Sequence, residues 1–168
     1  MTFAELKFIF PDATPETWHP HPLGGGWVQN TASVDPSAFV GPDAQVGGNA
    51  QVGGNSRVSE NSQVTGNAQI SGNARIYGNA RVWGDAQIRE QARVLGKARV
   101  FGEAQVRGNV RVSGSSWVYE QAQIWGDAEV SNNAHVSGQA QVSGLARVSG
   151  DAWVLGDAQI SGNENIVK

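Results

Sequence analysis

Three histidines are the side chains of this sequence best suited to proton transfer. His19 and His21 flank a proline near the start of the chain, and His135 lies far from both. A general base also needs a group that orients it and a cleft that holds its substrate. The acids nearest to His135 in sequence are Glu129 and Asp127, and no pattern indicates a cleft. His135 is therefore the candidate base, and the favoured interpretation of it is a surface residue.

Residues that bind metals are scarce. The chain has three His and no Cys, so a thiolate metal site and a disulfide are both excluded. The HPH segment at 19–21 has the chemistry for weak metal binding, but a loop flanked by Pro is the simpler interpretation. We expect no metal site and no cofactor.

Most of the chain follows a six-residue repeat. Steps of six from Val28 to Ile166 give 24 positions, all of them Val or Ile. The residue two places earlier, from Ala32 onward, is Ala or Ser in 21 of 23 units, and Gly stands two places later in 16 of 23. A helix would spread this period around its surface, whereas a short strand places Ala and Val on one side. Gly accepts the positive φ that a corner needs. Each unit is therefore predicted to be a short strand followed by a corner.

The residue before each Val or Ile shows a longer period of 18. One set is entirely glutamine: Gln51, Gln69, Gln87, Gln105, Gln123, Gln141 and Gln159. The next is arginine with one exception: Arg57, Arg75, Arg93, Arg111, Glu129 and Arg147. The third is mixed: Gln45, Gln63, Arg81, Arg99, Trp117, His135 and Trp153. Three distinct faces predict an all-β fold, a triangular parallel β-helix (β-solenoid) in which each coil takes up one period of 18, with nearly eight coils over residues 28–168. Hydrogen bonds between stacked Gln amides are expected along the first face.

Residues 1–27 do not repeat. AELKFIF at 4–10 has strand character, and Pro and Gly punctuate the following segment as in a loop. We expect residues 1–27 to form an N-terminal cap or an oligomer contact.

The repeat resembles that of the hexapeptide-repeat family. The six-residue unit of that family begins with an aliphatic residue and continues with a position that is often Gly, two variable residues, a small residue and one further residue. The resemblance covers residues 28–168 and implies a left-handed helix, although Gly here stands at the third position of the unit rather than the second. GGGWV at 24–28 resembles the start of repeat arrays in phage and prophage members and in uncharacterised acetyltransferase-like bacterial members.

The best-known enzymes of this family are trimeric acyltransferases, which bind acyl-CoA between subunits and use a His as general base. The resemblance thus implies one alternative function, an acyl-CoA-dependent acyltransferase with an intersubunit active site and His135 as its base. In those enzymes loops commonly break the repeat, but here no insertion occurs from Val28 to Ile166. A non-catalytic, rigid scaffold, phage-encoded as a virion component or a binder of a host factor, is the favoured prediction.

Aromatic and aliphatic residues decorate the outward positions of the repeat. Because Val, Ile and Ala already fill the inward positions, these side chains are predicted to form an interface. The candidates are Tyr77, Trp83, Leu95, Phe101, Trp117, Tyr119, Trp125 and Trp153. The resemblance implies a homotrimer with parallel axes. The alternative is that the rings only stack on one another and strengthen the coil.

Like charges repeat along the arginine face, at Arg57, Arg75, Arg93, Arg111 and Arg147. Such a row needs compensation, either from Glu60, Glu90, Asp85 and Asp127 or from a bound anion or protein partner. The net charge of −3 argues against long nucleic acid.

No apolar run reaches the roughly 18 residues that a membrane span needs. No basic segment followed by an apolar core stands at the N-terminus. We expect a soluble protein with no signal peptide, cytoplasmic or virion-associated.

Overall fold

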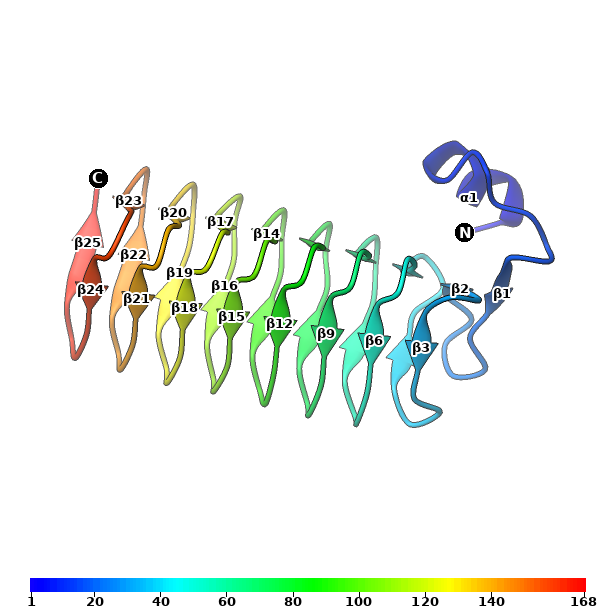
Figure 1. Ribbon diagram of the computed structural model, residues 1–168, viewed down its shortest axis with the longest axis horizontal. Coiled ribbons are helices and arrows are strands. Elements are labelled where there is room, and N and C mark those ends of the chain that lie inside the picture. Colours follow the sequence, from blue (N-terminus) through cyan, green and yellow to red (C-terminus); the bar gives the residue numbers. More distant parts are fainter.

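The computed structural model describes residues 1–168 as a solenoid that advances along one axis, with a helix and a hairpin at its N-terminal end (Figure 1). Its strands form three sheets. Sheet A contains β1 (Trp18–Pro20), β2 (Trp27–Gln29), β5 (Gln45–Val46), β8 (Gln63–Val64), β11 (Arg81–Val82), β14 (Arg99–Val100), β17 (Trp117–Val118), β20 (His135–Val136) and β23 (Trp153–Val154). Sheet B contains β3 (Ser33–Val34), β6 (Gln51–Val52), β9 (Gln69–Ile70), β12 (Gln87–Ile88), β15 (Gln105–Val106), β18 (Gln123–Ile124), β21 (Gln141–Val142) and β24 (Gln159–Ile160). Sheet C contains β4 (Phe39–Val40), β7 (Arg57–Val58), β10 (Arg75–Ile76), β13 (Arg93–Val94), β16 (Arg111–Val112), β19 (Glu129–Val130), β22 (Arg147–Ser149) and β25 (Asn165–Val167).

Each solenoid strand pairs in parallel with the strands one coil before and one coil after it. Gln87 on β12, for example, faces Gln69 on one side and Gln105 on the other, so the register advances by one period of 18 per coil. Sheets B and C have eight strands each, so the chain makes about eight coils. The predicted parallel β-solenoid, with one period of 18 in each coil, is confirmed.

The interior is built from the inward Val or Ile and Ala positions. They form one cluster of 38 buried residues that runs along the axis. Where Ser replaces Ala, its hydroxyl stays satisfied. Ser56 donates to the carbonyl oxygen of Gly53 at 2.7 Å, and Ser116 donates to that of Ser113 at 2.8 Å. No buried hydroxyl is left unpaired at these two sites, so the substitutions preserve the solenoid.

From Gly48 to Gly162, every corner has a positive φ two residues after the inward Val or Ile. Gly84 has φ 71°, and a Cβ added there would lie 2.9 Å from the backbone nitrogen of Gly102 in the next coil. Glu90 and Asn132 adopt the same conformation, with φ 63° and 60°. The predicted role of Gly in turning the chain is confirmed, and at Gly84 the next coil lies too close for a Cβ to be added without a shift.

Residues 4–9 are helical and Phe10 ends the helix, so the strand predicted for AELKFIF is wrong. Helix α1 (Phe3–Ile9) begins with a capping box, in which Glu5 donates its backbone N–H to the Thr2 hydroxyl at 3.3 Å and accepts from the Thr2 N–H at 2.6 Å. Phe3, Leu6 and Phe10 share one helical face, and Leu6 is buried beside Trp18. The helical spacing and the cap therefore outweigh the strand propensity of the Phe and Ile residues.

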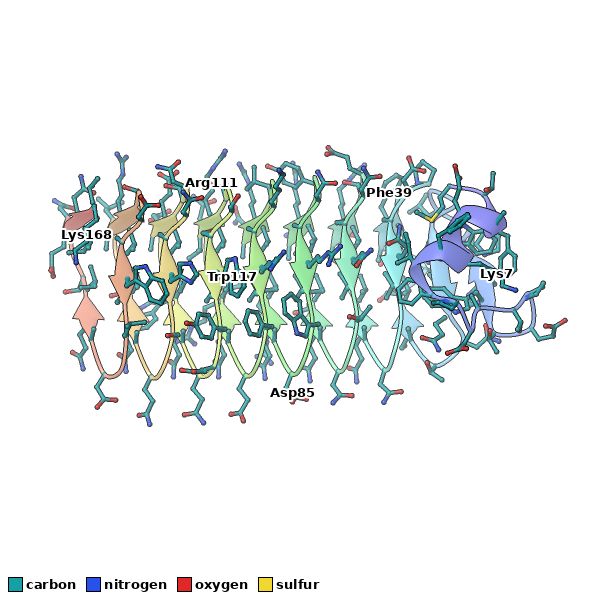
Figure 2. The ribbon with its side chains drawn as sticks, turned by 90° about the horizontal axis from the view of Figure 1, so that it is seen from above. Lys7, Phe39, Asp85, Arg111, Trp117 and Lys168 are labelled. Carbon is teal, nitrogen blue, oxygen red and sulfur yellow. The ribbon has the colours of Figure 1, made fainter.

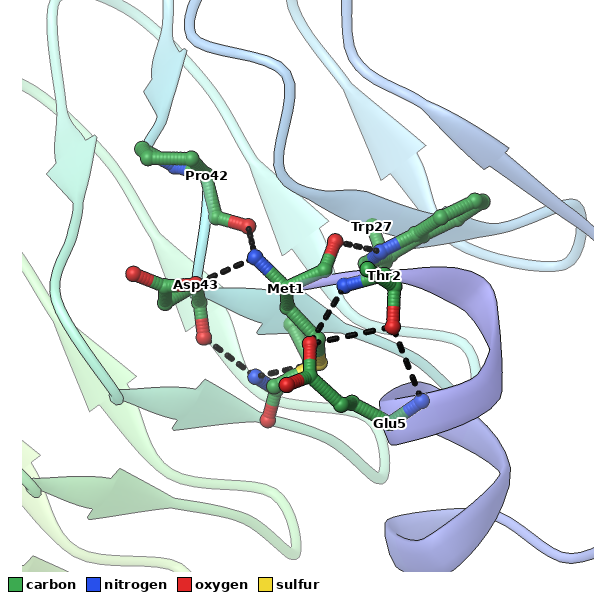
Figure 3. Close-up of polar contacts among 7 residues, drawn as sticks. Met1, Thr2, Glu5, Trp27, Pro42 and Asp43 are labelled. Carbon is green, nitrogen blue, oxygen red and sulfur yellow. Dashed lines mark hydrogen bonds and ion pairs between the residues drawn. The ribbon is translucent and has the colours of Figure 1, made fainter.

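The N-terminal segment is held against the first coil by polar contacts (Figure 3). The amine of Met1 donates to the carbonyl oxygen of Pro42 at 3.1 Å and forms an ion pair with Asp43. The indole Nε1 of Trp27 donates to the carbonyl oxygen of Met1 at 3.2 Å. Residues 1–27 thus cover the start of the solenoid. No helix in the structure has the length and apolar character that crossing a membrane requires.

The ladder of hydrogen bonds along the axis is made by different residues from those predicted. No hydrogen bond joins the side chains of neighbouring glutamines on sheet B. Asn and Asp at the corners make such bonds instead. Asn67 donates to Asp85 at 2.9 Å, and Asn109 donates to Asp127 at 3.0 Å.

Candidate functional site

Six rings on the outer surface of sheet A form one continuous group, the aromatic cluster. It comprises Trp83, Phe101, Trp117, Tyr119, His135 and Trp153. The in-register pairing of β11, β14, β17, β20 and β23 places these residues above one another. Figure 2 shows Trp117 in the middle of this face.

The rings form two columns that touch. In the corner column, Trp83 and Phe101 stack with centroids 4.3 Å apart and planes 3° apart, and Phe101 stacks on Tyr119 at 5.1 Å. In the strand column, His135 stacks on Trp153 at 4.3 Å and lies 5.3 Å from Trp117. The edge of Trp117 meets Phe101 at 6.0 Å, which joins the columns. Contacts of this geometry stabilise the rings against one another.

The aromatic cluster is open to solvent at one end. Trp153 is 55% exposed and Leu155, at the adjoining corner, is 47% exposed. The other rings are half-buried. Arg99 lies over Trp117, with its guanidinium carbon 4.7 Å from the ring centroid. The surface thus combines flat apolar rings with a cation, a composition typical of protein interfaces.

His135 is enclosed by its neighbours. Its Nδ1 is buried and has no hydrogen-bond partner, and burial lowers the pKa of the imidazole. Glu129, one of the two acids nearest in sequence, lies on β19 of sheet C, and Asp127 accepts its hydrogen bond from Asn109. The structure therefore brings His135 together with Trp117 and Trp153 and with no orienting carboxylate.

Three of the predicted interface residues lie outside the aromatic cluster. Tyr77 and Leu95 follow strands β10 and β13 of sheet C, on another edge of the solenoid. Trp125 follows β18 of sheet B, where the guanidinium carbon of Arg107 stands 5.7 Å from its ring centroid. The structure groups Trp83, Phe101, Trp117, Tyr119 and Trp153 and leaves these three apart.

The five predicted arginines form a straight row on the outer surface of sheet C, the arginine row: Arg57, Arg75, Arg93, Arg111 and Arg147. Glu129 stands between the last two, 4.0 Å from each. Glu60, Glu90, Asp85 and Asp127, the acids expected to compensate the row, form no ion pair with it. Because those acids sit at corners rather than on the strands of sheet C, their side chains do not meet the guanidinium groups.

The row also has a neighbour that the sequence pattern did not single out. The guanidinium carbon of Arg57 lies 4.6 Å above the ring centroid of Phe39, on the preceding coil. The period of 18 could have revealed this pair, because Phe39 stands 18 residues before Arg57, at the position that arginine takes in the later coils.

A hollow of about 610 Å³ separates helix α1 from sheet A. Phe8 and Ile9 line it on the helix side, and Asn79 and Arg81 line it on the sheet side. A smaller hollow shares Arg81 and extends to Trp83. The sequence pattern does not reveal this region, because it predicts a strand for residues 4–10, whereas the hollow depends on the helix. No group of three or more His, Cys, Asp or Glu side chains is arranged to hold a metal ion.

Comparisons with known proteins agree with the architecture. Four segments, residues 68–76, 74–90, 104–120 and 140–156, match the YdcK beta-solenoid repeat. The solved structure of LpxA from Acinetobacter baumannii is similar at 16% sequence identity, with a TM-score of 0.39 over 81% of this chain and 71% of that chain. No curated protein matches the chain. The matched segments lie within the six-residue repeat and the parallel three-sheet solenoid that it forms, so the chain has a β-solenoid fold similar to the YdcK beta-solenoid repeat.

Proposed function

We propose that the protein is a non-catalytic, rigid scaffold that self-associates through the aromatic cluster and binds a partner through the arginine row. The observation that supports this most is the cluster itself. Its rings stand outside an interior already filled by Val, Ile and Ala. Trp153 and Leu155 remain about half exposed at one end of it. Apolar patches of this kind usually mark contact surfaces.

A trimer with parallel axes is the arrangement we favour. A solenoid is stiff because each coil is hydrogen-bonded to its neighbours along its whole perimeter. Two stiff rods that meet along their length bury a long strip without reordering their backbones, which keeps the entropic cost of association low. A flat column of stacked rings suits such a contact.

The experiment is sedimentation equilibrium of the wild type and of two matched variants. Trp83→Ser removes the ring at one end of the corner column, and Trp125→Ser removes the same side chain at a corner outside the cluster. We expect the wild type to be a trimer and Trp83→Ser to weaken association by at least about 30-fold, the effect of losing a tryptophan that contributes strongly to an interface. Trp125→Ser should associate as the wild type does.

Two outcomes would overturn the proposal. A wild type that stays monomeric, in which Trp83→Ser only lowers the melting temperature, would assign the rings to coil stacking alone. Binding of acetyl-CoA in a calorimeter, with an acyl-transfer activity that His135→Ala abolishes, would contradict the non-catalytic role.

A further inference from the structure

Most of the positive charge of this acidic protein gathers on one side. Of the 12 Lys and Arg residues, nine lie on sheet C or at its two edges. Five form the arginine row. Arg89 and Arg107 stand at the corner before sheet C, and Lys97 and Lys168 stand at the corner after it. Eight of the 15 Asp and Glu residues share these positions, so the positive excess is confined to the outward positions of the sheet itself, where five arginines stand with one glutamate.

On the strands of sheet C only Glu129 faces the arginine row, and the acids at the two edges of the sheet form no ion pair with it. Those acids are Asp35, Asp43, Glu60, Glu90, Asp127, Asp151 and Glu164. Glu129 contacts Arg111 and Arg147, both at the outer limit of an ion pair, 4.0 Å. Arg75 and Arg93 have no acidic partner, and Arg57 rests on the ring of Phe39. All five side chains are exposed. Guanidinium groups one strand spacing apart, about 4.8 Å, repel one another, so the row costs stability unless an anion covers it.

We propose that the arginine row binds a linear anionic polysaccharide, with a carboxylate or sulfate on each sugar, lying along the solenoid axis. This inference rests on the proposed function and gives the chemical class of the partner. Arg57, Arg75, Arg93 and Arg111 follow one another in consecutive coils, in register. Neighbouring strands are about 4.8 Å apart, so anionic groups that repeat at this spacing along one side of an extended chain would meet successive arginines. The planar guanidinium fork pairs with carboxylate or sulfate through two hydrogen bonds.

Single-stranded nucleic acid fits this surface less well. Proteins that bind it combine cations with aromatic rings on which bases stack. The stacked rings here belong to sheet A, a different face from the row. On sheet C itself, the ring of Phe39 is already covered by Arg57.

A second copy of this chain is also a poorer fit. The acidic edge lies between sheets A and B, and Figure 2 shows its Asp85 on the opposite side of the view from Arg111. This edge carries Asp85, Glu103, Glu120 and Asp157, and the coil of Gln139 has no acid there, so at most three consecutive coils are acidic. Asp85 accepts a hydrogen bond from Asn67 at 2.9 Å, and Glu103 accepts one from Gln121 at 3.4 Å. Four consecutive arginines have no matching run of four acids.

The experiment is isothermal titration calorimetry of the full chain with defined probes. A tetrameric oligouronate carries carboxylates and a sulfated tetrasaccharide carries sulfates. The uronate monomer tests whether binding needs several arginines of the row, and oligo-dT tests whether the row binds single-stranded nucleic acid. We expect at least one tetramer to bind, the monomer to bind at least about 100-fold more weakly because it meets one arginine, and affinity to fall as salt is added. Arg75→Glu and Arg93→Glu should each lower the affinity at least about tenfold.

Arg81→Glu is the matched control, because Arg81 lies in the same coil as Arg75 but on sheet A. It should leave glycan affinity unchanged. Equal losses in Arg75→Glu and Arg81→Glu would overturn the proposal, as would a lack of binding by both tetramers or tighter binding of oligo-dT. If instead Arg75→Glu abolishes self-association, a second copy covers the row and the proposal fails. Sedimentation of the same samples separates these results from the proposed function, since self-association through the aromatic cluster survives the loss of glycan binding.

Discussion

Sheets A and C have the same backbone arrangement but carry different outward side chains. Val82 and Val94 point inward from them in the same way, and both sheets repeat with the same period of 18. On the outside, sheet A stacks Trp83 on Phe101 at 4.3 Å, whereas sheet C places Arg75 beside Arg93. The coil is thus specified by the inward residues and the corners, which leaves the outward positions open to different uses.

The two faces differ in what they contribute to folding. Each aromatic pair stabilises its coils by about 0.5 to 1.5 kcal/mol, whereas like charges directly opposite each other on adjacent strands are destabilising. The aromatic cluster can therefore serve stability and association together. The arginine row has no such role in stability, which favours a role in binding.

Among substitutions that test the difference between the two faces, Phe101→Ser is expected to have the largest effect on stability. Phe101 contacts Trp83, Tyr119 and Trp117. Loss of these contacts should lower the free energy of unfolding of the monomer by about 2 to 3 kcal/mol. Urea unfolding at a protein concentration below that of self-association measures this effect.

Leu95→Ser is the control on the other side of the solenoid. Leu95 follows β13 of sheet C and is half-buried outside the aromatic cluster. Its loss should change the unfolding free energy by less than about 1 kcal/mol. If both substitutions have the same effect, the aromatic cluster contributes no more to the monomer than any outward apolar side chain, and the contrast between the faces is wrong.

A substitution at a corner tests how much the positive φ and the close approach of successive corners contribute to the stability of the coil that sheets A and C share. Gly84→Ala introduces a Cβ at φ 71° and 2.9 Å from the nitrogen of Gly102. We expect a loss of about 1 to 2 kcal/mol in urea unfolding, from the left-handed conformation and the contact together.

Gly156→Ala separates the two causes, since nothing lies within 4 Å of its Cβ although its φ is 63°. It should cost less than Gly84→Ala. Equal costs would mean that the conformation alone matters and that the close approach of successive corners does not.

The solenoid was predictable because the residue types that repeat each serve one structural role, burial for Val, Ile and Ala and turning for Gly. Val at one position and Ala two residues earlier can only both be buried on a short strand, and the separation of Gln87 from Arg93 revealed three faces. The helix at Phe3–Ile9 was not, since it lies outside the repeat and its signal, Thr2 with Glu5, is brief.

The candidate site was only partly predictable. Register placed Trp117, His135 and Trp153 together, and the structure confirms their stacking. Register does not say which long side chains reach across a corner. The position of Arg99 over Trp117 and the hydrogen bonds of Asn67 in place of those expected of glutamines depend on side-chain conformation.

A smaller effect of opposite sign is expected on sheet C. Arg93 faces Arg75 and Arg111, so Arg93→Gln removes two like-charge neighbours and should raise the free energy of unfolding by about 0.5 kcal/mol. Urea unfolding at low ionic strength gives the clearest measurement, because salt screens the repulsion.

Arg147→Gln, the same substitution in the same row, should not stabilise, because the neighbour of Arg147 is Glu129 at 4.0 Å. Stabilisation by Arg147→Gln as large as that by Arg93→Gln would show that the gain comes from the glutamine and not from relief of repulsion.

The smallest effect concerns the histidine that joins the two ends of the strand column. Burial against Trp117 and Trp153 lowers the pKa of His135 in the folded protein below its ordinary value of 6.5. Above that value the imidazole is neutral in both states and has no effect on stability. As the pH falls through it, the unfolded chain takes up the proton first, so stability falls until the folded imidazole is protonated as well. Between about pH 7.5 and about pH 5.5, the wild type should therefore lose more stability than His135→Gln, and an NMR titration of the imidazole should give the lowered pKa directly. Parallel stability curves for the two proteins would show that the rings on sheet A enclose His135 too loosely to affect its protonation, leaving the aromatic face, like the arginine face, insensitive to pH in this range.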